Sequence, residues 1–142
     1  MNLINIQVIE GKAALEYTGP LRVEVFEKEQ GFVDEFDELD EVSVHVMLEL
    51  DNSIIASGRM YEEYPHQYHL GRIVVKRSYR SQGHGKSVVE TLVNLAKEKG
   101  AHQCVLSSQT HACAFYESCG FIKEGDVYLE QGQPHQWMIY NI

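Results

Sequence analysis

Cysteine and long apolar runs are scarce in this sequence of 142 residues. Its three cysteines, Cys104, Cys113 and Cys119, are an odd number without a Cys-x-x-Cys pair. That pattern argues against a disulfide framework and favours reduced thiols in a cytosolic setting. Nowhere do the roughly 18 consecutive apolar residues of a membrane span occur, and the first residues, "MNLINIQVIEG", lack the basic start and apolar run of a secretory signal. We therefore expect a cytoplasmic protein without a membrane partner.

Basic residues are also in deficit. There are 12 Lys and Arg against 21 Asp and Glu, which gives a formal net charge of -9. An acidic surface of this kind repels phosphate backbones, so the composition argues against a nucleic-acid partner and tolerates a cationic small substrate. Hydrophobic content of 44% and charged content of 23% are typical of globular proteins. The length fits a single domain over residues 1–142.

Apolar periodicity alternates between strand and helix patterns along the chain. The clearest strand is "VSVHVMLEL" at 42–50, in which alternate valines and leucines predict one apolar and one polar face. Thr18 or Gly19 can cap a helix that begins at Pro20 and ends at Gly31. The full pattern predicts strands at 3–9, 42–50, 54–61, 70–75 and 103–108, helices at 20–30, 86–99 and 110–120, and a closing hairpin at 127–142.

This order of elements predicts an α+β fold. The acidic segment 34–41 is expected to be a solvated loop, while "LGRIVV" at 70–75 is apolar enough for a buried central strand. The helix at 86–99 joins that strand to the strand at 103–108, which makes one β-α-β crossover in the middle of the chain.

The junction between the central strand and the helix after it carries two glycines in "YRSQGHGKS", residues 79–87. A Walker A phosphate loop would need glycine where Arg80 stands, and a dinucleotide-binding loop would need glycine where Val88 stands. The segment still has one general property of an anion site: Gly83 and Gly85 let main-chain N–H groups at a helix start approach an anion closely. An anion site and a tight turn that needs glycine for packing alone both fit the segment.

Two segments in the right order resemble the GCN5-related N-acetyltransferase (GNAT) family. "RSQGHG" at 80–85 matches the family's Arg/Gln-x-x-Gly-x-Gly/Ala turn, and "AFYESCGF" at 114–121 is similar to its second motif. In addition, "RVEVFEKEQGF" and "GQPHQWM" resemble a bacterial subgroup that includes the ElaA and YjcF types. The resemblance implies a mixed, mostly antiparallel twisted sheet flanked by helices, with a central β-α-β unit that binds acyl-coenzyme A.

The resemblance also implies where acetyl-coenzyme A, the expected co-substrate, binds. Its pyrophosphate would lie on the glycine turn and its pantetheine arm along the central strand, and no metal would take part. The implied activity is transfer of an acetyl group to a primary amine by direct attack on the thioester. The cofactor-binding residues expected on this basis are Ile73, Val74, Val75, Arg80, Ser81, Gln82, Gly83, His84, Gly85, Lys86, Ser87, Gln109 and Phe115.

Catalysis of this kind needs an acid and a base. The resemblance assigns the acid role to Tyr116, because a phenol near the sulfur can donate a proton or a hydrogen bond to the departing thiolate. A base must accept a proton from the substrate amine, which is mostly protonated at neutral pH. Glu29 lies in a segment expected to line the acceptor cleft. Glu62, Glu63 and His135 are further candidates, and the sequence does not choose among the four.

Two other functions remain open on the sequence. One is a non-catalytic acyl-coenzyme A sensor on the same fold, and the other is a nucleotide-binding switch that uses "GHGKS" as a degenerate phosphate loop. A metal site has weak support, since His66 and His69 are three residues apart with no cysteine near them in sequence. The acceptor can be a small-molecule amine or a protein amine, and the resemblance allows a homodimer.

Overall fold

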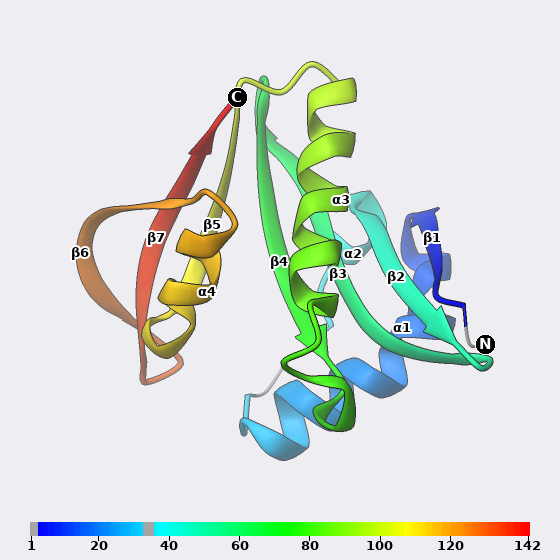
Figure 1. The fold of residues 1–142 in the computed structure, drawn as a ribbon. Helices are drawn as coiled ribbons and strands as arrows, with labels where there is room; N and C mark the ends of the chain where they lie inside the picture. The colour runs from blue at the N-terminus through cyan, green and yellow to red at the C-terminus, as the bar shows by residue number, and fades with distance from the viewer. Residues whose placement is uncertain (1–2, 33–35) are drawn as a thin grey trace.

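One open sheet of seven strands organises residues 3–32 and 36–142, the part of the chain that this computed structural model describes. The strand order is β1-β2-β3-β4-β5-β7-β6, and every neighbouring pair is antiparallel except β4 with β5 (Figure 1). This confirms the expected mixed, mostly antiparallel sheet. The strands are β1 (Asn5–Glu10), β2 (Val44–Leu50), β3 (Ser53–Tyr64), β4 (Gln67–Val75), β5 (Gln103–Gln109), β6 (Ile122–Glu130) and β7 (Gln133–Asn141).

Helices flank this sheet and supply the connections between its strands. None of the helices in the described residues has the length and apolar character needed to cross a membrane. The α-helices are α1 (Leu15–Arg22), α2 (Leu39–Val42), α3 (His84–Glu98) and α4 (Cys113–Ser118). Short helical segments are η1 (Lys12–Ala14), the π-helical continuation of α1, η2 (Val23–Glu29), and the 3-10 turns η3 (Arg77–Tyr79) and η4 (Thr110–Ala112).

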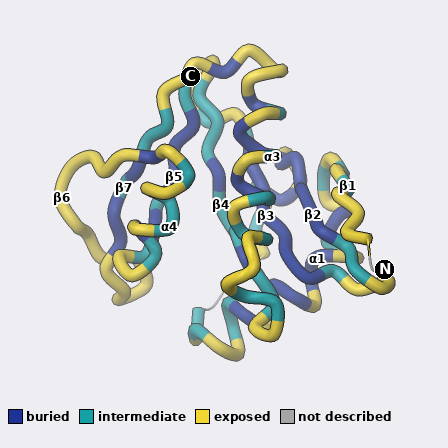
Figure 2. The backbone as a smooth tube through the Cα atoms, in the orientation of Figure 1, coloured by how far each residue is buried: buried dark blue, intermediate teal, exposed yellow. Residues whose placement is uncertain are grey.

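Hydrophobic clusters form on both faces of β4. Val75 packs in the cluster that contains α3, whereas Val74 packs with Leu21 and Val25 of α1 and η2. Consecutive residues of a strand point to opposite faces, so α3 and the α1–η2 helix cover opposite faces of the sheet. α3 buries a stripe at helical spacing against the centre of the sheet (Figure 2): Val88, Val89, Leu92, Val93 and Ala96.

The two parallel strands at the centre of the sheet pair over a short stretch and then separate. Residues Gln67–His69 of β4 pair with Gln103–Val105 of β5, and the remaining residues of both strands have no partner in each other. Figure 1 shows β4 and β5 meeting near the C-terminus and diverging toward the start of α3 and toward α4. On its other side β4 carries a bulge against β3, where Arg72 has a φ of 54°. The sheet is therefore open at the point where α3 begins.

The first long helix begins earlier than the sequence predicts. α1 starts at Leu15, so Pro20 lies inside the helix instead of at its first position. The Thr18 hydroxyl does not cap the helix; it donates to the carbonyl oxygen of Ala14, one turn back, at 3.2 Å. The prediction that the helix ends at Gly31 is confirmed, because this glycine has a φ of 76° and its N–H donates to the carbonyl of Glu27.

The acidic segment is not the solvated loop that the sequence predicts. Residues 34 and 35 lie outside the described part of the chain, but Asp40 is only 1% exposed. Its carboxylate accepts hydrogen bonds from Arg22 at 2.8 Å and from Arg59 at 2.7 Å. Arg59 also donates to Asp37 at 2.7 Å, and Arg72 lies 3.4 Å from the same carboxylate. A buried charge cluster therefore joins the start of α2 to α1 and β3.

Strand boundaries and one strand face also differ from expectation. β3 and β4 extend into the segment 62–69 between the two predicted strands and form a hairpin there, and the closing hairpin begins at Ile122 instead of 127. β2 begins at Val44, and its predicted polar face is buried. His45 on that face contacts the carbonyl of Asp40 through Nε2 at 3.0 Å. The acidic segment thus supplies a hydrogen-bond partner for the buried imidazole of His45, which makes its burial favourable.

We expect Asp40→Asn to lower the free energy of unfolding by about 3 kcal/mol at pH 7, because it removes the negative charge that two buried guanidinium groups share. Burial raises the pKa of Asp40, but the hydrogen bonds and charges of Arg22 and Arg59 outweigh it and lower the pKa to about 2. This stability is present above the ordinary pKa of 3.8 and is lost as the pH falls through about 2. Urea titration from pH 7 to pH 2 should therefore show the gap between wild type and variant closing in acid.

The matched control is Asp51→Asn in the exposed β2–β3 turn, where the φ of 50° suits asparagine. It should unfold at the same urea concentration as the wild type. A variant at Asp40 that is as stable as the wild type at pH 7 would show that the cluster contributes nothing.

Candidate active site

The turn between β4 and α3 exposes main-chain donors at a helix start. Gly83 has a φ of 85° and stands just before the first residue of α3, and Ser81 has a φ of 63°. No side chain caps the helix, and the first helical N–H bond there is from Ser87 to the carbonyl of Gly83, at 3.0 Å. The N–H groups of residues 84–86 therefore have no partner within the helix. Together with the dipole of a 15-residue helix, they form an anion cradle.

A cavity of about 560 Å³, here called the turn cavity, extends from this cradle along the open edge of β4 to α4. Gly85 shapes its wall, because a Cβ there would lie 3.1 Å from Cζ of Phe115 and 3.4 Å from Cγ2 of Val75. Most of the expected cofactor-binding residues line it; Gln82, Ser87 and Gln109 do not. Those that do are Ile73, Val74, Val75, Arg80, Ser81, Gly83, His84, Gly85, Lys86 and Phe115.

A second cavity of about 400 Å³, here called the sheet cavity, lies where β4 and β5 separate. Aromatic and charged side chains from β3, β4, β6 and β7 line it, together with Gln109 at the end of β5. The Gln109 amide donates to the side-chain oxygen of Gln30 at 2.8 Å. The two cavities meet, because five residues line both: Gln30, Ile73, His111, Ala112 and Tyr116.

Tyr116 stands at this junction. Its ring packs edge-on against Phe115 at 5.0 Å and Phe121 at 6.1 Å between ring centroids. Burial raises the pKa of Tyr116 above its ordinary value, so the hydroxyl stays protonated at neutral pH. Within residues 3–32 and 36–142, no protein group forms a hydrogen bond with that hydroxyl. A neutral donor is therefore available where the two cavities join.

Comparison with known proteins decides the family. The model of the acetyltransferase (GNAT) family matches residues 12–121. The chain belongs to the GNAT family. The Bacillus subtilis protein YyaT is 33% identical over 144 residues, which cover 98% of this chain and 97% of YyaT.

Solved structures agree with this GNAT assignment. An acyl-CoA N-acyltransferase from Pseudomonas aeruginosa is 28% identical, with a TM-score of 0.86 over 97% of this chain and 99% of the other. Escherichia coli ElaA has the same fold at 23% identity, with a TM-score of 0.87 over 98% of this chain and 100% of ElaA. The resemblance to the GNAT family and to its ElaA type is confirmed, and the protein is an acetyltransferase by family.

Glu29, the first base candidate, is held outside both GNAT cavities. Its two carboxylate oxygens accept hydrogen bonds from Arg80 at 2.6 and 2.8 Å, and Arg80 also donates through Nε to the carbonyl of Val75 at 3.0 Å. The hydrogen bond from Arg80 lowers the pKa of Glu29. A carboxylate that is ionised and already paired is a weak proton acceptor, so this geometry argues against Glu29 as the base.

The other base candidates lie at different places. Glu63 accepts a hydrogen bond from Nδ1 of His69 at 2.6 Å, and the His69 ring stacks on Tyr61 and meets Trp137 edge-on. His69 lines the sheet cavity, as His135 does. No motif in the sequence marks His69 as a catalytic group, although its place opposite Tyr61 follows once β3 and β4 are known to pair.

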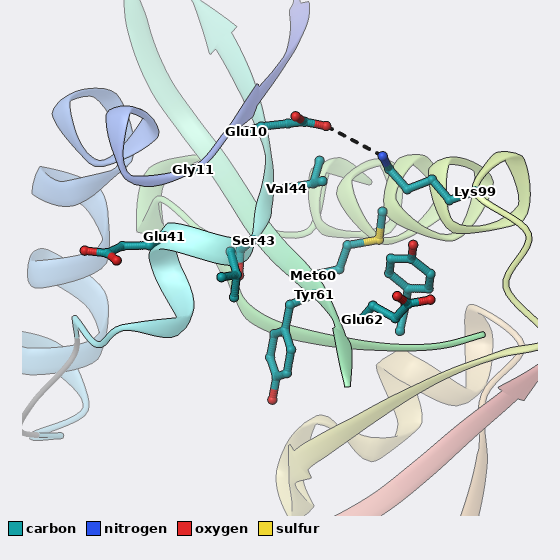
Figure 3. Close-up of a pocket in the computed structure, with 11 residues that line it drawn as sticks. Glu10, Gly11, Glu41, Ser43, Val44, Met60, Tyr61, Glu62 and Lys99 are labelled. Carbon is teal, nitrogen blue, oxygen red and sulfur yellow. Dashed lines mark ion pairs between the residues drawn. The ribbon is translucent and has the colours of Figure 1, made fainter. Parts of the chain in front are cut away.

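Glu62 faces a separate depression between β1, β2, β3 and the end of α3 (Figure 3). Glu10 and Lys99 lie 3.6 Å apart across it, as the dashed line shows. Tyr61 is shared with the sheet cavity, but Tyr116 and the anion cradle are not part of this depression. Within the described residues, no three His, Cys, Asp or Glu side chains are arranged to hold a metal ion.

We expect Gly83→Ala to lower the free energy of unfolding by about 1 kcal/mol, because an L-residue with a side chain is strained at its φ of 85°. Gly71→Ala is the control, since a Cβ there meets no atom within 4 Å and the φ is not positive. Urea denaturation of both variants measures the difference. Equal loss in the two would mean that the left-handed turn is not the cause.

Proposed function

We propose that the protein transfers an acetyl group from acetyl-coenzyme A to a primary amine by direct attack of the amine on the thioester. The observation that supports this most strongly is the junction at Tyr116. One of the cavities that meet there begins at an anion cradle, and the other opens across the sheet. Such an arrangement lets two substrates approach one point from opposite sides.

The turn cavity suits the coenzyme. The main-chain donors of residues 84–86 would hold the pyrophosphate, and Lys86 adds a positive charge beside them. Beyond His69, β4 has no hydrogen-bonding partner in β5. The main-chain groups at Ile73–Val75 that neither β3 nor Arg80 bonds can therefore pair with the amides of the pantetheine arm, as a neighbouring strand would.

Chemistry at the junction needs a group that stabilises charge on sulfur. When the amine nitrogen forms its bond to the carbonyl carbon, the C–S bond breaks and its electron pair leaves on the sulfur. The neutral hydroxyl of Tyr116 donates a hydrogen bond to that sulfur as the charge develops. The sheet cavity of about 400 Å³ would hold the acceptor, which is a small amine or the amine of a protein side chain.

A binding and turnover experiment tests this proposal against its two alternatives. Acetyl-coenzyme A should raise the melting temperature, because a ligand that binds the native state stabilises it, whereas ATP should not. Release of free coenzyme A thiol should then follow when an arylalkylamine, a polyamine, an aminoglycoside or a lysine peptide is added. Stabilisation without release from any amine would favour a sensor, and stabilisation by ATP alone would favour a nucleotide switch.

Tyr116→Phe should lower kcat by about 100-fold, because the hydrogen bond to the leaving sulfur is lost. Acetyl-coenzyme A should still raise the melting temperature of the variant, since the cradle at the start of α3 is unchanged. Steady-state kinetics and a thermal shift measure the two effects. Tyr64→Phe, at an exposed position that lines neither cavity, is the matched tyrosine control and should keep the wild-type kcat within a few-fold. A wild-type kcat in Tyr116→Phe would remove this tyrosine from the mechanism.

A further inference from the structure

We infer that His135 is the general base of this site and that Glu130 stabilises it once it has taken the proton. The inference rests on the proposed acetyl transfer and assigns the one proton acceptor that the sequence leaves undecided. Both residues line the sheet cavity. They lie on the two strands of the β6–β7 hairpin, close to its turn, and His135 pairs with Gln109 at the end of β5.

The level of His135 along the sheet matches that of the cavity junction, where the proposed reaction would take place. Val105 pairs with His69, and four residues further along β5 Gln109 pairs with His135 of β7. Ile73 likewise lies four residues beyond His69 on β4 and lines both cavities. Ile73 and His135 therefore stand at the same height on the two sides of the opening. His69 lies roughly 13 Å further back along β4, which is too far for direct proton transfer at the thioester.

The hydrogen bonds of His135 define which nitrogen can accept a proton. Nδ1 lies 2.8 Å from the carbonyl oxygen of Gln133. Because a carbonyl oxygen only accepts, Nδ1 carries the hydrogen, and in the neutral ring Nε2 carries a lone pair. Nε2 is 3.3 Å from Oε2 of Glu130, so a proton that arrives there completes an ion pair. The hydrogen bond at Nδ1 thus directs an incoming proton to Nε2, where Glu130 stabilises the charged ring.

Two aromatic rings hold the imidazole in place, and Glu130 is the group that contacts Nε2. His135 is 3% exposed, with Phe32 edge-on at 6.3 Å and Tyr128 stacked at 6.2 Å. The titratable or charged groups that face it are Glu130 and Tyr128 from β6, and His111 of η4 lies on the same cavity. The Glu130 side chain is 53% exposed, so it can turn toward the ammonium group of an entering acceptor and leave Nε2 open to the nitrogen.

The proton balance of the reaction follows. An N–H bond of the ammonium breaks and its proton passes to Nε2, which frees the lone pair that forms the C–N bond. The C–S bond breaks and its electron pair leaves on sulfur. The second proton that the nitrogen sheds neutralises the thiolate through the Tyr116 hydroxyl, and His135 releases its own proton to solvent.

The test uses the fastest amine found in the panel above. His135→Gln should lower kcat by about 100-fold while acetyl-coenzyme A still raises the melting temperature. In the wild type, kcat/KM should fall in acid, where the base is protonated before it can act, and this acidic limb should be absent in the variant. Added imidazole should restore part of the activity of His135→Ala, because it can occupy the space of the missing ring. Glu130→Gln should also lower kcat, but by less than His135→Gln does.

The control is His102→Gln, an exposed histidine that lines neither cavity and stacks on His66. It should keep both kcat and the acidic limb. A structural role for His135 would lower activity without removing the limb or allowing rescue by imidazole, and that result would overturn the inference. If His135→Ala does not fold, the pH profile of His135→Gln decides. Absence of turnover in the wild type would instead contradict the proposed function.

Discussion

The separation of β4 from β5 is the constraint on which the site depends. Parallel strands that share three pairs and then part leave main-chain donors and acceptors unpaired inside a protein, which is costly unless something else bonds them. Here the open edge of β4 faces a cavity at Ile73–Val75, and a bulge at Arg72 turns the strand as it opens. The same separation brings α4 to the opening, so that Tyr116 reaches a point that both cavities share.

A buried charge cluster positions the wall of the sheet cavity on one side of this opening. Asp40 binds Arg22 of α1 and Arg59 of β3, and Asp37 binds Arg59 as well. These bonds tie the α1–η2 helix and the start of α2 to the sheet. The helix then delivers Gln30 to the junction, where its side chain meets Gln109 at the end of β5. The cavity walls are thus positioned by ion pairs on one side and by apolar packing of α3 on the other.

Much of this architecture could be predicted from local patterns. The glycines at 83 and 85 marked the helix start because a left-handed residue and a close approach to Phe115 both exclude larger side chains. The motif of α4 placed Tyr116 by resemblance. The burial of Asp40 in the acidic segment could not be predicted, since the arginines that pair with it lie 18 and 19 residues away in sequence. The helix start predicted at Pro20 was wrong for a related reason. Tertiary packing continues the helix through a residue that usually begins one.

A net charge of -9 poses a physical problem for a protein proposed to bind a polyanionic coenzyme. The structure suggests why side-chain charge is not the main attraction. Arg80, the one arginine that lines the turn cavity, has its guanidinium paired with Glu29 and with the carbonyl of Val75. Its role in the proposed site is then to join η2 to the turn and to hold the left-handed conformation that follows. In the proposed site the attraction falls mainly to main-chain N–H groups and the dipole of α3, with Lys86 beside them, and these groups act at short range.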